Sequence, residues 1–487
     1  MKENNNQQQH MLRRTKIIAT LGPTTDDNLT LKEMIHEGVD IVRLNFSHNS
    51  YKYHERRIAM VREAAKQEKR VIGILVDLQG PKIRISSFKS GKIRLNEGEQ
   101  FILDADLPSE EGTEEKVGID YKDLPKDVKT GDILLLDDGR LKLIVQRIKE
   151  NSIICQVAIG GELSNYKGIN RLGGGLSAKS ITTKDIDDLK FAINLNVDYV
   201  AVSFPRDSED IMKAKCLIQR YKGKVGIIAK IERAEAVKNI KTIIEASDGV
   251  MVARGDLAIE IGDAQVPLVQ KDIIRRARSL DKPVIIATQM MESMIHTSVP
   301  NRAEVSDVAN AVLDNVDAVM LSAETAIGDY PTLAVRAMAR VCVASELQPR
   351  SHISRHRIEC RFKRTDEAIA MATMYTANHL DIKAIVALTE SGSTPLWMSR
   401  IRTAIPVYGL SRFDKSLGRM TLYRGVYPIK FDPTKYNREE VNVRAIAVME
   451  KQGLLNRGDL VILTKGDYMG IGGGSNAMKI LTVGKVI

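Results

Sequence analysis

Several apolar runs of this chain end in charged or hydroxyl-bearing residues, and those ends hold the side chains that could do chemistry. The residues at these ends are Arg43, Asn45, Ser47, Asp77, Lys82, Arg84, Lys230, Glu232, Arg254, Asp256, Thr288 and Glu324. Carboxylates can hold a hard divalent cation, and lysine and arginine can stabilise a phosphoryl group during its transfer. The set therefore favours metal-assisted phosphoryl transfer.

Glu232 and Asp256 close two consecutive apolar runs, and their residue types point to a metal site. Carboxylate oxygens without sulfur or imidazole ligands nearby suit Mg²⁺ or Mn²⁺ held together with substrate oxygens. For a single carboxylate, a structural salt bridge is the more common explanation. Two carboxylates at adjacent ends, close to Lys230 and Arg43, favour the metal site.

The elements that must position these residues recur along the chain as apolar runs followed by helical stretches. The runs cover residues 16–23, 39–48, 71–80, 197–205, 225–232, 249–256, 283–290 and 316–324. Continuous rather than alternating hydrophobicity is typical of parallel strands that are covered on both faces. The pattern predicts an α/β fold with a (β/α)8 TIM barrel over residues 11–84 and 179–348, whose reactive residues lie at the C-terminal strand ends.

A long interval between the third and fourth runs breaks this period. Residues 85–178 alternate apolar with polar positions and are cut by glycine-containing turns, which predicts an inserted small β-barrel domain. The insert is entered near Pro81 and left near residues 173–175. Because it grows from a loop at the reactive face, we expect it to act as a lid that excludes water.

After residue 348 a second αβ series begins. Its apolar runs at 384–391, 405–411, 426–431 and 459–467 predict a C-terminal α/β domain over residues 349–487. At the other end, the polar residues 1–10 are rich in Asn and Gln and are expected to be a disordered tail.

Composition narrows the function classes. The formal charge of the 487 residues is +10, but the basic residues are spread without Lys/Arg blocks, which favours a solvated surface or a small anionic substrate over nucleic acid. The four cysteines stand singly, so neither zinc nor disulfides are predicted. The apolar runs fall short of the ~20 residues that a membrane-spanning helix needs, so we expect no membrane association and a cytoplasmic protein.

Familiar phosphate-binding motifs are incomplete in this chain. Residues 173–180 resemble a P-loop but have Ala178 where glycine is needed, and residues 470–476 lack the last glycine of a dinucleotide motif. Residues 389–395 (TESGSTP) form a hydroxyl-rich turn between a strand and a helix, which suits a phosphate. Such a lone motif is more often a capped turn.

Taken in order, the motifs of this chain resemble those of pyruvate kinases from the end of the tail onward. The matching stretches are RRTKIIATLGP, VRLNFSH, DLQGPKIR, GDILLLDDGR, IAKIERAEAV, MVARGDLAIEIG, ATQMMESM, NRAEVSDVANAV and MLSAETAIGDYP. The likeness is greatest to the bacterial type that is not activated by fructose 1,6-bisphosphate. It implies transfer of the phosphoryl group of phosphoenolpyruvate to ADP, which gives pyruvate and ATP.

The resemblance also implies roles for single residues. Glu232 and Asp256 would bind the divalent ion, Mg²⁺ or Mn²⁺, while Lys230 and Arg43 stabilise the phosphoryl group. Thr288 would help to protonate the enolate. The substrate carboxylate would be received by Thr288 and by backbone N–H groups near Gly255 and Asp256. The residues expected to face ADP are Pro23, His48, Tyr53, Arg84 and Lys184.

In most of the family a K⁺ ion is held by the equivalents of Asn45, Ser47, Asp77 and the carbonyl of Leu78. Those members usually read DTKGPEIR where this chain reads DLQGPKIR, so Lys82 replaces a glutamate. A compact ammonium can supply the charge of K⁺ in covalent form. We predict that Lys82 pairs with Asp77, helps to arrange the catalytic Arg84, and makes K⁺ unnecessary.

The resemblance places a phosphorylated allosteric effector on the C-terminal domain. The matching loop is Thr389, Glu390, Ser391, Gly392, Ser393 and Thr394. Relatives that respond to fructose 1,6-bisphosphate tend to carry lysine at the position of Glu390, so a monophosphate such as AMP, ribose 5-phosphate or glucose 6-phosphate is expected. The family is usually tetrameric, which predicts a homotetramer.

Two other functions fit parts of this pattern. A Mg²⁺-dependent aldolase or lyase on the same barrel would also steady an enolate with carboxylates and an arginine. It would, however, have little use for Lys230, for a Tyr53 facing ADP or for a lid. A nucleic-acid binder would rest on the net charge alone.

Overall fold

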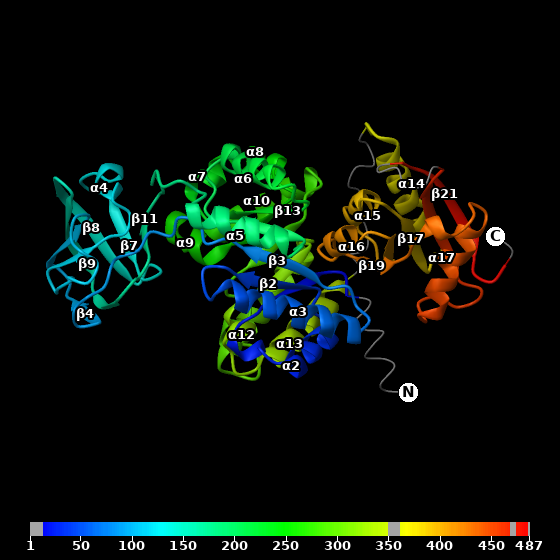
Figure 1. The fold of residues 1–487 in the computed structure, drawn as a ribbon, viewed down its shortest axis with the longest axis horizontal. Coiled ribbons are helices and arrows are strands. Elements are labelled where there is room, and N and C mark those ends of the chain that lie inside the picture. Colours follow the sequence, from blue (N-terminus) through cyan, green and yellow to red (C-terminus); the bar gives the residue numbers. More distant parts are fainter. Residues whose placement is uncertain (1–12, 349–360, 468–473, 486–487) are drawn as a thin grey trace.

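The computed structural model describes residues 13–348, 361–467 and 474–485. The predicted tail of residues 1–10 lies outside these residues. A β-rich insert lies at one end of the molecule, a barrel surrounded by helices in the middle, and an α/β domain at the other end (Figure 1). In the described part of the chain, no helix has both the length and the apolar character needed to cross a membrane.

The central body is a closed barrel of eight parallel strands in the order β1-β16-β15-β14-β13-β12-β3-β2. Its strands are β1 (Lys16–Thr20), β2 (Ile41–Asn45), β3 (Gly73–Asp77), β12 (Tyr199–Val202), β13 (Gly226–Ile231), β14 (Gly249–Ala253), β15 (Val284–Ala287) and β16 (Ala318–Leu321). Each strand lies inside one of the predicted apolar runs. The predicted (β/α)8 barrel is therefore confirmed.

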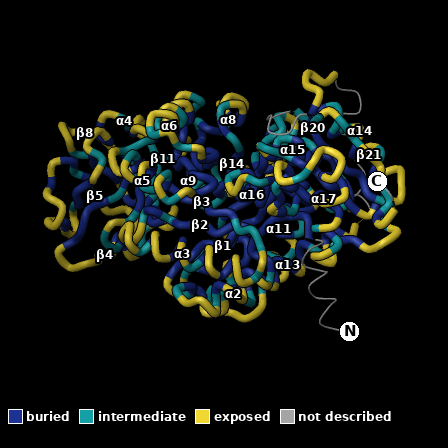
Figure 2. Tube along the Cα trace, turned by 45° about the vertical axis from the view of Figure 1, so that its right-hand side comes forward, coloured by how far each residue is buried: buried dark blue, intermediate teal, exposed yellow. Residues whose placement is uncertain are grey.

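Helices surround the barrel and bury its outer surface. They are α2 (Asn28–Glu37), α3 (Tyr51–Gln67), α5 (Thr183–Asn194), α6 (Ser208–Arg220), α7 (Ala234–Lys238), α8 (Ile240–Ala246), α9 (Arg254–Ile261), α10 (Val266–Ser279), α11 (Arg302–Leu313), α12 (Ala323–Ala326) and α13 (Pro331–Glu346). Their apolar faces and the outward side chains of the strands form one buried cluster. Figure 2 shows buried chain running through the barrel strands, with exposed chain at the periphery.

Four aspartates fix the N-terminal rim of the barrel. Each precedes a strand and accepts a hydrogen bond from a backbone N–H of the neighbouring strand. The pairs are Ile17 N with Asp40 at 2.9 Å, Ile74 N with Asp198 at 2.9 Å, Ile227 N with Asp248 at 2.8 Å and Val284 N with Asp317 at 3.0 Å. These bonds satisfy backbone donors at the buried rim and hold neighbouring strands in register.

The inserted domain consists of two sheets around one core. One has the order β11-β7-β8-β9-β5-β6 and the other is β10-β4. The elements are β4 (Lys92–Leu95), β5 (Gln100–Asp104), β6 (Lys116–Gly118), α4 (Leu124–Asp127), β7 (Ile133–Leu136), β8 (Leu141–Lys149), β9 (Ser152–Ile159), β10 (Gly161–Ser164) and β11 (Ile169–Arg171). The predicted insert is therefore a β domain with one core. Within the described residues, its two sheets do not pair into a closed barrel.

The C-terminal domain has one five-stranded sheet in the order β19-β18-β17-β20-β21. Its elements are α14 (Thr365–His379), β17 (Ala384–Leu388), α15 (Ser393–Ser399), β18 (Val407–Ser411), α16 (Asp414–Met420), β19 (Val426–Lys430), α17 (Glu440–Lys451), β20 (Leu460–Gly466) and β21 (Ser475–Thr482). The predicted parallel strands are present, and the antiparallel edge strand β21 adds a fifth that the apolar runs did not indicate.

The C-terminal domain is less separate from the barrel than the sequence suggested. Side chains inside the barrel and side chains of this domain form a single buried cluster. At the same boundary, Arg400 and Asp317 form a fully buried ion pair, with Nη1 of Arg400 3.0 Å from Oδ2 of Asp317. The C-terminal domain thus packs against the N-terminal end of the barrel, and the C-terminal rim is the end where chemistry is expected.

Candidate active site

The C-terminal rim of the barrel brings Arg43, Asp77 and Lys230 into contact. Lys230 Nζ lies 3.3 Å from Asp77 Oδ1, and Arg43 Nη2 lies 2.6 Å from Asp77 Oδ2. Burial opposes the charge of Asp77, but Lys230 and Arg43 outweigh it and hold the pKa of this carboxyl below its usual value. One buried carboxylate therefore orients two cations at the mouth of the barrel.

Lys230 stands between two carboxylates. Besides Asp77, its Nζ contacts Glu232 Oε1 at 2.8 Å. Burial alone would lower the pKa of Lys230, yet the two carboxylates raise it above the usual lysine value, so the ammonium stays charged. A buried, permanently charged donor of this kind can stabilise negative charge that develops on a substrate.

Ser203 is a further residue at this cluster, and our reasoning from the sequence missed it. Lys230 Nζ donates a hydrogen bond to Ser203 Oγ at 2.8 Å, and Ser203 Oγ donates to the carbonyl of Leu78 at 2.7 Å. Ser203 directly follows strand β12, so the rule that reactive residues follow barrel strands could have found it. Thr20 was missed in the same way, and its Oγ1 accepts from Arg43 Nη1 at 3.0 Å.

Glu232 and Asp256 have the properties of a cation site. Glu232 is 1% exposed, and its Oε2 accepts from the backbone N–H of Phe204 at 2.9 Å. Its Oε1 is buried and is occupied by the ion pair with Lys230. Burial raises the pKa of Glu232, Lys230 opposes this rise, and the negative charge of Asp256 adds to it. A cation between the two carboxylates would relieve their repulsion.

These two carboxylates fit Mg²⁺ or Mn²⁺, both of which prefer hard oxygen ligands. Within the described residues, no group of three or more His, Cys, Asp and Glu side chains could hold a metal ion. The remaining coordination positions would therefore fall to substrate oxygens and water, as expected for an ion that binds together with a substrate.

Thr288 adopts an unusual backbone conformation beside the start of α9. Its φ is +67° and that of Gln289 is +55°, a region that β-branched residues rarely occupy. Thr288 Oγ1 accepts from the backbone N–H of Gly255 at 2.9 Å, and Arg254 Nη2 donates to the carbonyl of Thr288 at 2.7 Å. These contacts hold the strained loop against the N-terminus of a helix, where anionic groups are stabilised.

The predicted partner of Lys82 is wrong. The Lys82 ammonium lies 3.5 Å from Asp256 Oδ1, while the partners of Asp77 are Arg43 and Lys230. Asp77 ends strand β3 with its side chain toward the barrel axis, whereas the Gly-Pro turn carries Lys82 out toward the first turn of α9. Lys82 is therefore placed beside a candidate metal ligand.

The other residues predicted for the monovalent-cation site lie at the ends of β2 and β3. Asn45 Oδ1 accepts from the backbone N–H of Ser47 at 3.1 Å. Leu78 is buried, and its carbonyl accepts from Ser203. Asn45 Oδ1 and the carbonyl oxygen of Leu78 thus each already accept a hydrogen bond from a protein group.

The residues predicted to face ADP divide into two groups, and the first is open at the surface. Pro23 and His48 are both exposed. Partial burial of its ring, and then the charges of Arg84, Arg43 and Lys82, lower the pKa of His48, so its imidazole lies in a positive field. Arg84 Nη1 donates to the carbonyl of Tyr166 in the insert at 2.9 Å, which places it between the two domains.

The second group is engaged with other protein atoms. The hydroxyl of Tyr53 donates to a carboxylate oxygen of Asp26, and the guanidinium of Arg57 lies 4.1 Å from the Tyr53 ring centroid. Lys184 Nζ donates to Asp188 Oδ2 at 2.6 Å. Their arrangement would have to change for them to reach a nucleotide.

The predicted effector loop connects β17 to α15. Gly392 has a φ of +83°, and its N–H donates to Thr389 Oγ1 at 2.9 Å. Thr394 Oγ1 lies 2.8 Å from Ser475 Oγ of β21. Glu390 Oε2 is 3.3 Å from Arg412 Nε, so the acidic side chain of the loop is paired.

Known protein families and relatives match nearly the whole chain. The family model for the pyruvate kinase barrel domain matches residues 12–335, and the model for the pyruvate kinase alpha/beta domain matches residues 367–481. Pyruvate kinase from Buchnera aphidicola (Acyrthosiphon pisum) is 53% identical, covering 97% of this chain and 99% of that protein. Pyruvate kinase II from Salmonella typhimurium is 52% identical with the same coverage.

A more distant relative agrees with these two. Pyruvate kinase from Staphylococcus aureus is 39% identical, covering 98% of this chain and 81% of that protein. Both family models and full-length relatives thus point to one family of phosphotransferases, and the charged cluster at the barrel rim lies within the matched barrel domain. The chain therefore belongs to the pyruvate kinase family and is an enzyme of that family.

Proposed function

We propose that this enzyme transfers the phosphoryl group of phosphoenolpyruvate to ADP, giving pyruvate and ATP, as the last step of glycolysis. The observation that carries the proposal is the charged Lys230 ammonium, held 2.8 Å from Glu232 and 3.3 Å from Asp77 at the barrel rim. A transferring phosphoryl group needs fixed positive charge of this kind.

In the proposed reaction the bond between phosphorus and the enol oxygen breaks, and a bond forms to a terminal oxygen of ADP. Lys230 and Arg43 stabilise the phosphoryl group as it moves. Glu232 and Asp256 hold the divalent cation, which supplies electrostatic stabilisation of the phosphoryl and enolate oxygens when it is bound. The enolate then takes up a proton at its methylene carbon, with Thr288 acting through water.

The substrates are positioned by the groups around this centre. The carboxylate of phosphoenolpyruvate binds at the start of α9, to the N–H groups of Gly255 and Asp256 and to the hydroxyl of Thr288. The contact between Gly255 N and Thr288 Oγ1 supports this placement, because it brings two of these groups together. ADP approaches along Pro23, His48, Tyr53, Arg84 and Lys184. The insert of residues 85–178 closes over the site as a lid and excludes water.

The enzyme is of the bacterial type that is not activated by fructose 1,6-bisphosphate, and it needs no K⁺. Lys82 supports the second part of this proposal, because its ammonium lies next to Asp256. There it adds a permanent positive charge to the site.

Regulation resides in the C-terminal domain of residues 349–487. A sugar monophosphate or AMP binds the loop Thr389–Thr394, where Glu390 disfavours a second phosphate. The enzyme works in the cytoplasm as a homotetramer, in which subunits communicate the effector signal.

A coupled assay tests the proposed reaction. Purified enzyme with phosphoenolpyruvate, ADP and Mg²⁺ should form pyruvate and ATP in equal amounts. Omission of Mg²⁺ or addition of a chelator should stop the reaction. Absence of ATP formation under these conditions would show that the assignment is wrong.

A further inference from the structure

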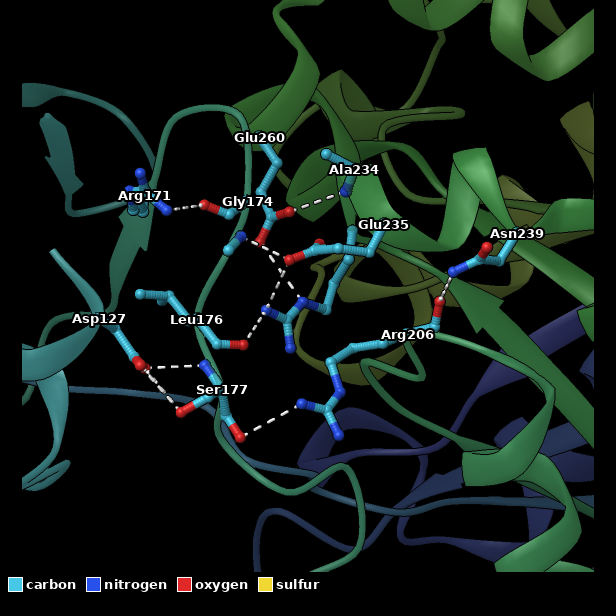
Figure 3. Close-up of polar contacts among 12 residues, drawn as sticks. Asp127, Arg171, Gly174, Leu176, Ser177, Arg206, Ala234, Glu235, Asn239 and Glu260 are labelled. Atoms are coloured by element: carbon cyan, nitrogen blue, oxygen red, sulfur yellow. Dashed lines mark hydrogen bonds and ion pairs between the residues drawn. The ribbon is translucent and has the colours of Figure 1, made fainter.

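The segment by which the chain leaves the lid is fastened to the barrel by hydrogen bonds of several of its residues, among them Leu176 and Ser177 (Figure 3). This exit segment, residues 171–177, lies against the start of α7, which follows β13, and against the C-terminal end of α9, which follows β14. The backbone N–H of Gly173 donates to the carbonyl of Glu260 on α9 at 2.8 Å. Arg233 Nη2 donates to the carbonyl of Leu176 at 2.7 Å. The seat of the lid is thus formed by residues close in sequence to the candidate metal ligands.

Glu260 also joins the two segments that carry these ligands. Its Oε2 accepts from the backbone N–H of Ala234 at 2.8 Å, and its Oε1 lies 3.9 Å from Arg233 Nε. Ala234 is two residues after Glu232, and Glu260 is one helical turn after Asp256 on α9. The side chain of Glu260, which is only 3% exposed, therefore ties the start of α7 to α9.

The contact between the exit segment and the start of α7 is tightly packed, but some of its buried polar atoms have no hydrogen bond. The N–H of Gly175 donates to the carboxylate of Glu235, and a Cβ on Gly174 would lie 2.6 Å from Oε2 of the same side chain. Arg233 Nε and Glu235 Oε2 are buried without a hydrogen bond. Unused polar atoms of this kind allow partners to be exchanged when the exit segment shifts.

We propose that Glu260 and Arg233 are positioning residues that set the spacing of Glu232 and Asp256 and couple it to the seating of the lid. The inference rests on the proposed function, because it takes these two carboxylates as metal ligands. Glu260 links the segments that carry Glu232 and Asp256 directly, through the backbone N–H of Ala234. Arg233, which lies beside Glu260, connects this contact to the lid through the carbonyl of Leu176. Groups that orient metal ligands typically contribute 10–100-fold to metal affinity.

The test measures the affinity of the full chain for Mn²⁺ in the absence of substrates. The concentration of free Mn²⁺ is monitored by its electron paramagnetic resonance signal. We expect Glu260→Gln and Arg233→Lys each to weaken Mn²⁺ binding by about tenfold or more, within the range for groups that orient metal ligands. They should also raise the KM for phosphoenolpyruvate more than they lower kcat, since the groups that act on the phosphoryl group are retained.

Arg206→Lys is the matched control, because Arg206 Nη1 also reaches the exit segment, donating to the carbonyl of Ser177 at 3.3 Å. In the described structure Arg206 has no hydrogen bond or ion pair with Glu260 or with the start of α7. Its backbone carbonyl accepts from Asn239 Nδ2 at the end of α7 at 3.0 Å, a contact that Arg206→Lys leaves in place. This variant should bind Mn²⁺ as the wild type does. An equal loss of affinity in Arg206→Lys would overturn the proposal, because it would show a general effect of loosening the lid.

Failure of the proposal can be separated from failure of the metal assignment with Glu232→Gln. If Glu232→Gln loses Mn²⁺ binding while Glu260→Gln and Arg233→Lys bind within twofold of wild type, the positioning role is wrong. If Glu232→Gln binds Mn²⁺ normally, the metal ligands themselves are wrong and the inference falls with them. Should Glu260→Gln fail to fold, Arg233→Lys decides the question by the same measurement.

Discussion

Replacement of Lys82 by glutamate should turn this enzyme into one that depends on K⁺. The Lys82 ammonium lies 3.5 Å from Asp256 Oδ1, with side chains 30% and 24% exposed. At this distance an effective dielectric constant of 20 gives an attraction of about 5 kcal/mol. Because both groups are partly exposed, water reduces this to about 2 kcal/mol. We expect the Lys82 charge to stabilise the transferring phosphoryl group by a similar amount, which corresponds to about 30-fold in rate.

Lys82→Glu removes this attraction and places a carboxylate near Asp256 instead. Without K⁺ we therefore expect kcat/KM for phosphoenolpyruvate to fall by at least about 30-fold, the factor estimated for the ion pair. Added K⁺ should restore most of the loss, because the new carboxylate can help to hold the cation. Lys82→Gln, which removes the charge without adding a carboxylate, should lose activity but respond less to K⁺.

The assay couples pyruvate formation to lactate dehydrogenase in buffers free of Na⁺ and K⁺, with tetramethylammonium chloride or KCl at equal ionic strength. The coupling enzyme must first be shown to work equally well in both salts. Wild type should have the same kcat/KM in the two salts within about twofold, well below the effect estimated for the ion pair. Strong activation of the wild type by K⁺, or no response of Lys82→Glu to it, would refute the reasoning.

Three further variants test other parts of the structure. Lys230→Met should lower kcat by at least about 100-fold in the coupled assay, the scale of losing one well-placed electrostatic donor; near-normal turnover would remove Lys230 from the mechanism. Arg400→Met leaves Asp317 buried without its ion-pair partner, and in urea unfolding it should cost about 3–5 kcal/mol; a loss below 1 kcal/mol would show that water compensates. Burial raises the pKa of Asp198 to about 6, above its unfolded value, so its contribution to stability is fully present below the unfolded pKa and is lost as pH rises through about 6. Relative to wild type, Asp198→Asn should therefore gain about 1 kcal/mol in free energy of unfolding between pH 5 and pH 7.5, and a pH-independent difference would contradict the assigned pKa.

Much of the barrel and of its rim could be predicted from the sequence. A strand covered on both faces must be apolar throughout, so the eight runs were visible without knowledge of their partners. Since parallel strands all place their C-terminal ends at one rim, Arg43, Asp77 and Lys230 could be expected to lie near each other. The residue types then limited the chemistry that such a rim can perform.

Which side chains pair at the rim was decided only by the tertiary structure. The sequence places Lys82 five residues after Asp77, yet the Gly-Pro turn directs the ammonium to Asp256 on α9. Ser203 belongs to the cluster because β12 neighbours β3 in the closed barrel, although the chain between them passes through the inserted β domain. Pairing of this kind depends on the direction of each side chain and on the order of strands around the barrel, and neither follows from a local pattern.

At the boundary between the barrel and the C-terminal domain, too, the sequence predicted the elements but not the contacts between them. Each domain was visible in the sequence as its own series of strands and helices. Their shared core and the buried pair of Arg400 and Asp317 could not be predicted from the sequence. An apolar or charged residue type does not show which distant residue it will contact, because that depends on how the two domains pack. Local sequence determined the elements and the chemical groups, and long-range packing determined which groups meet.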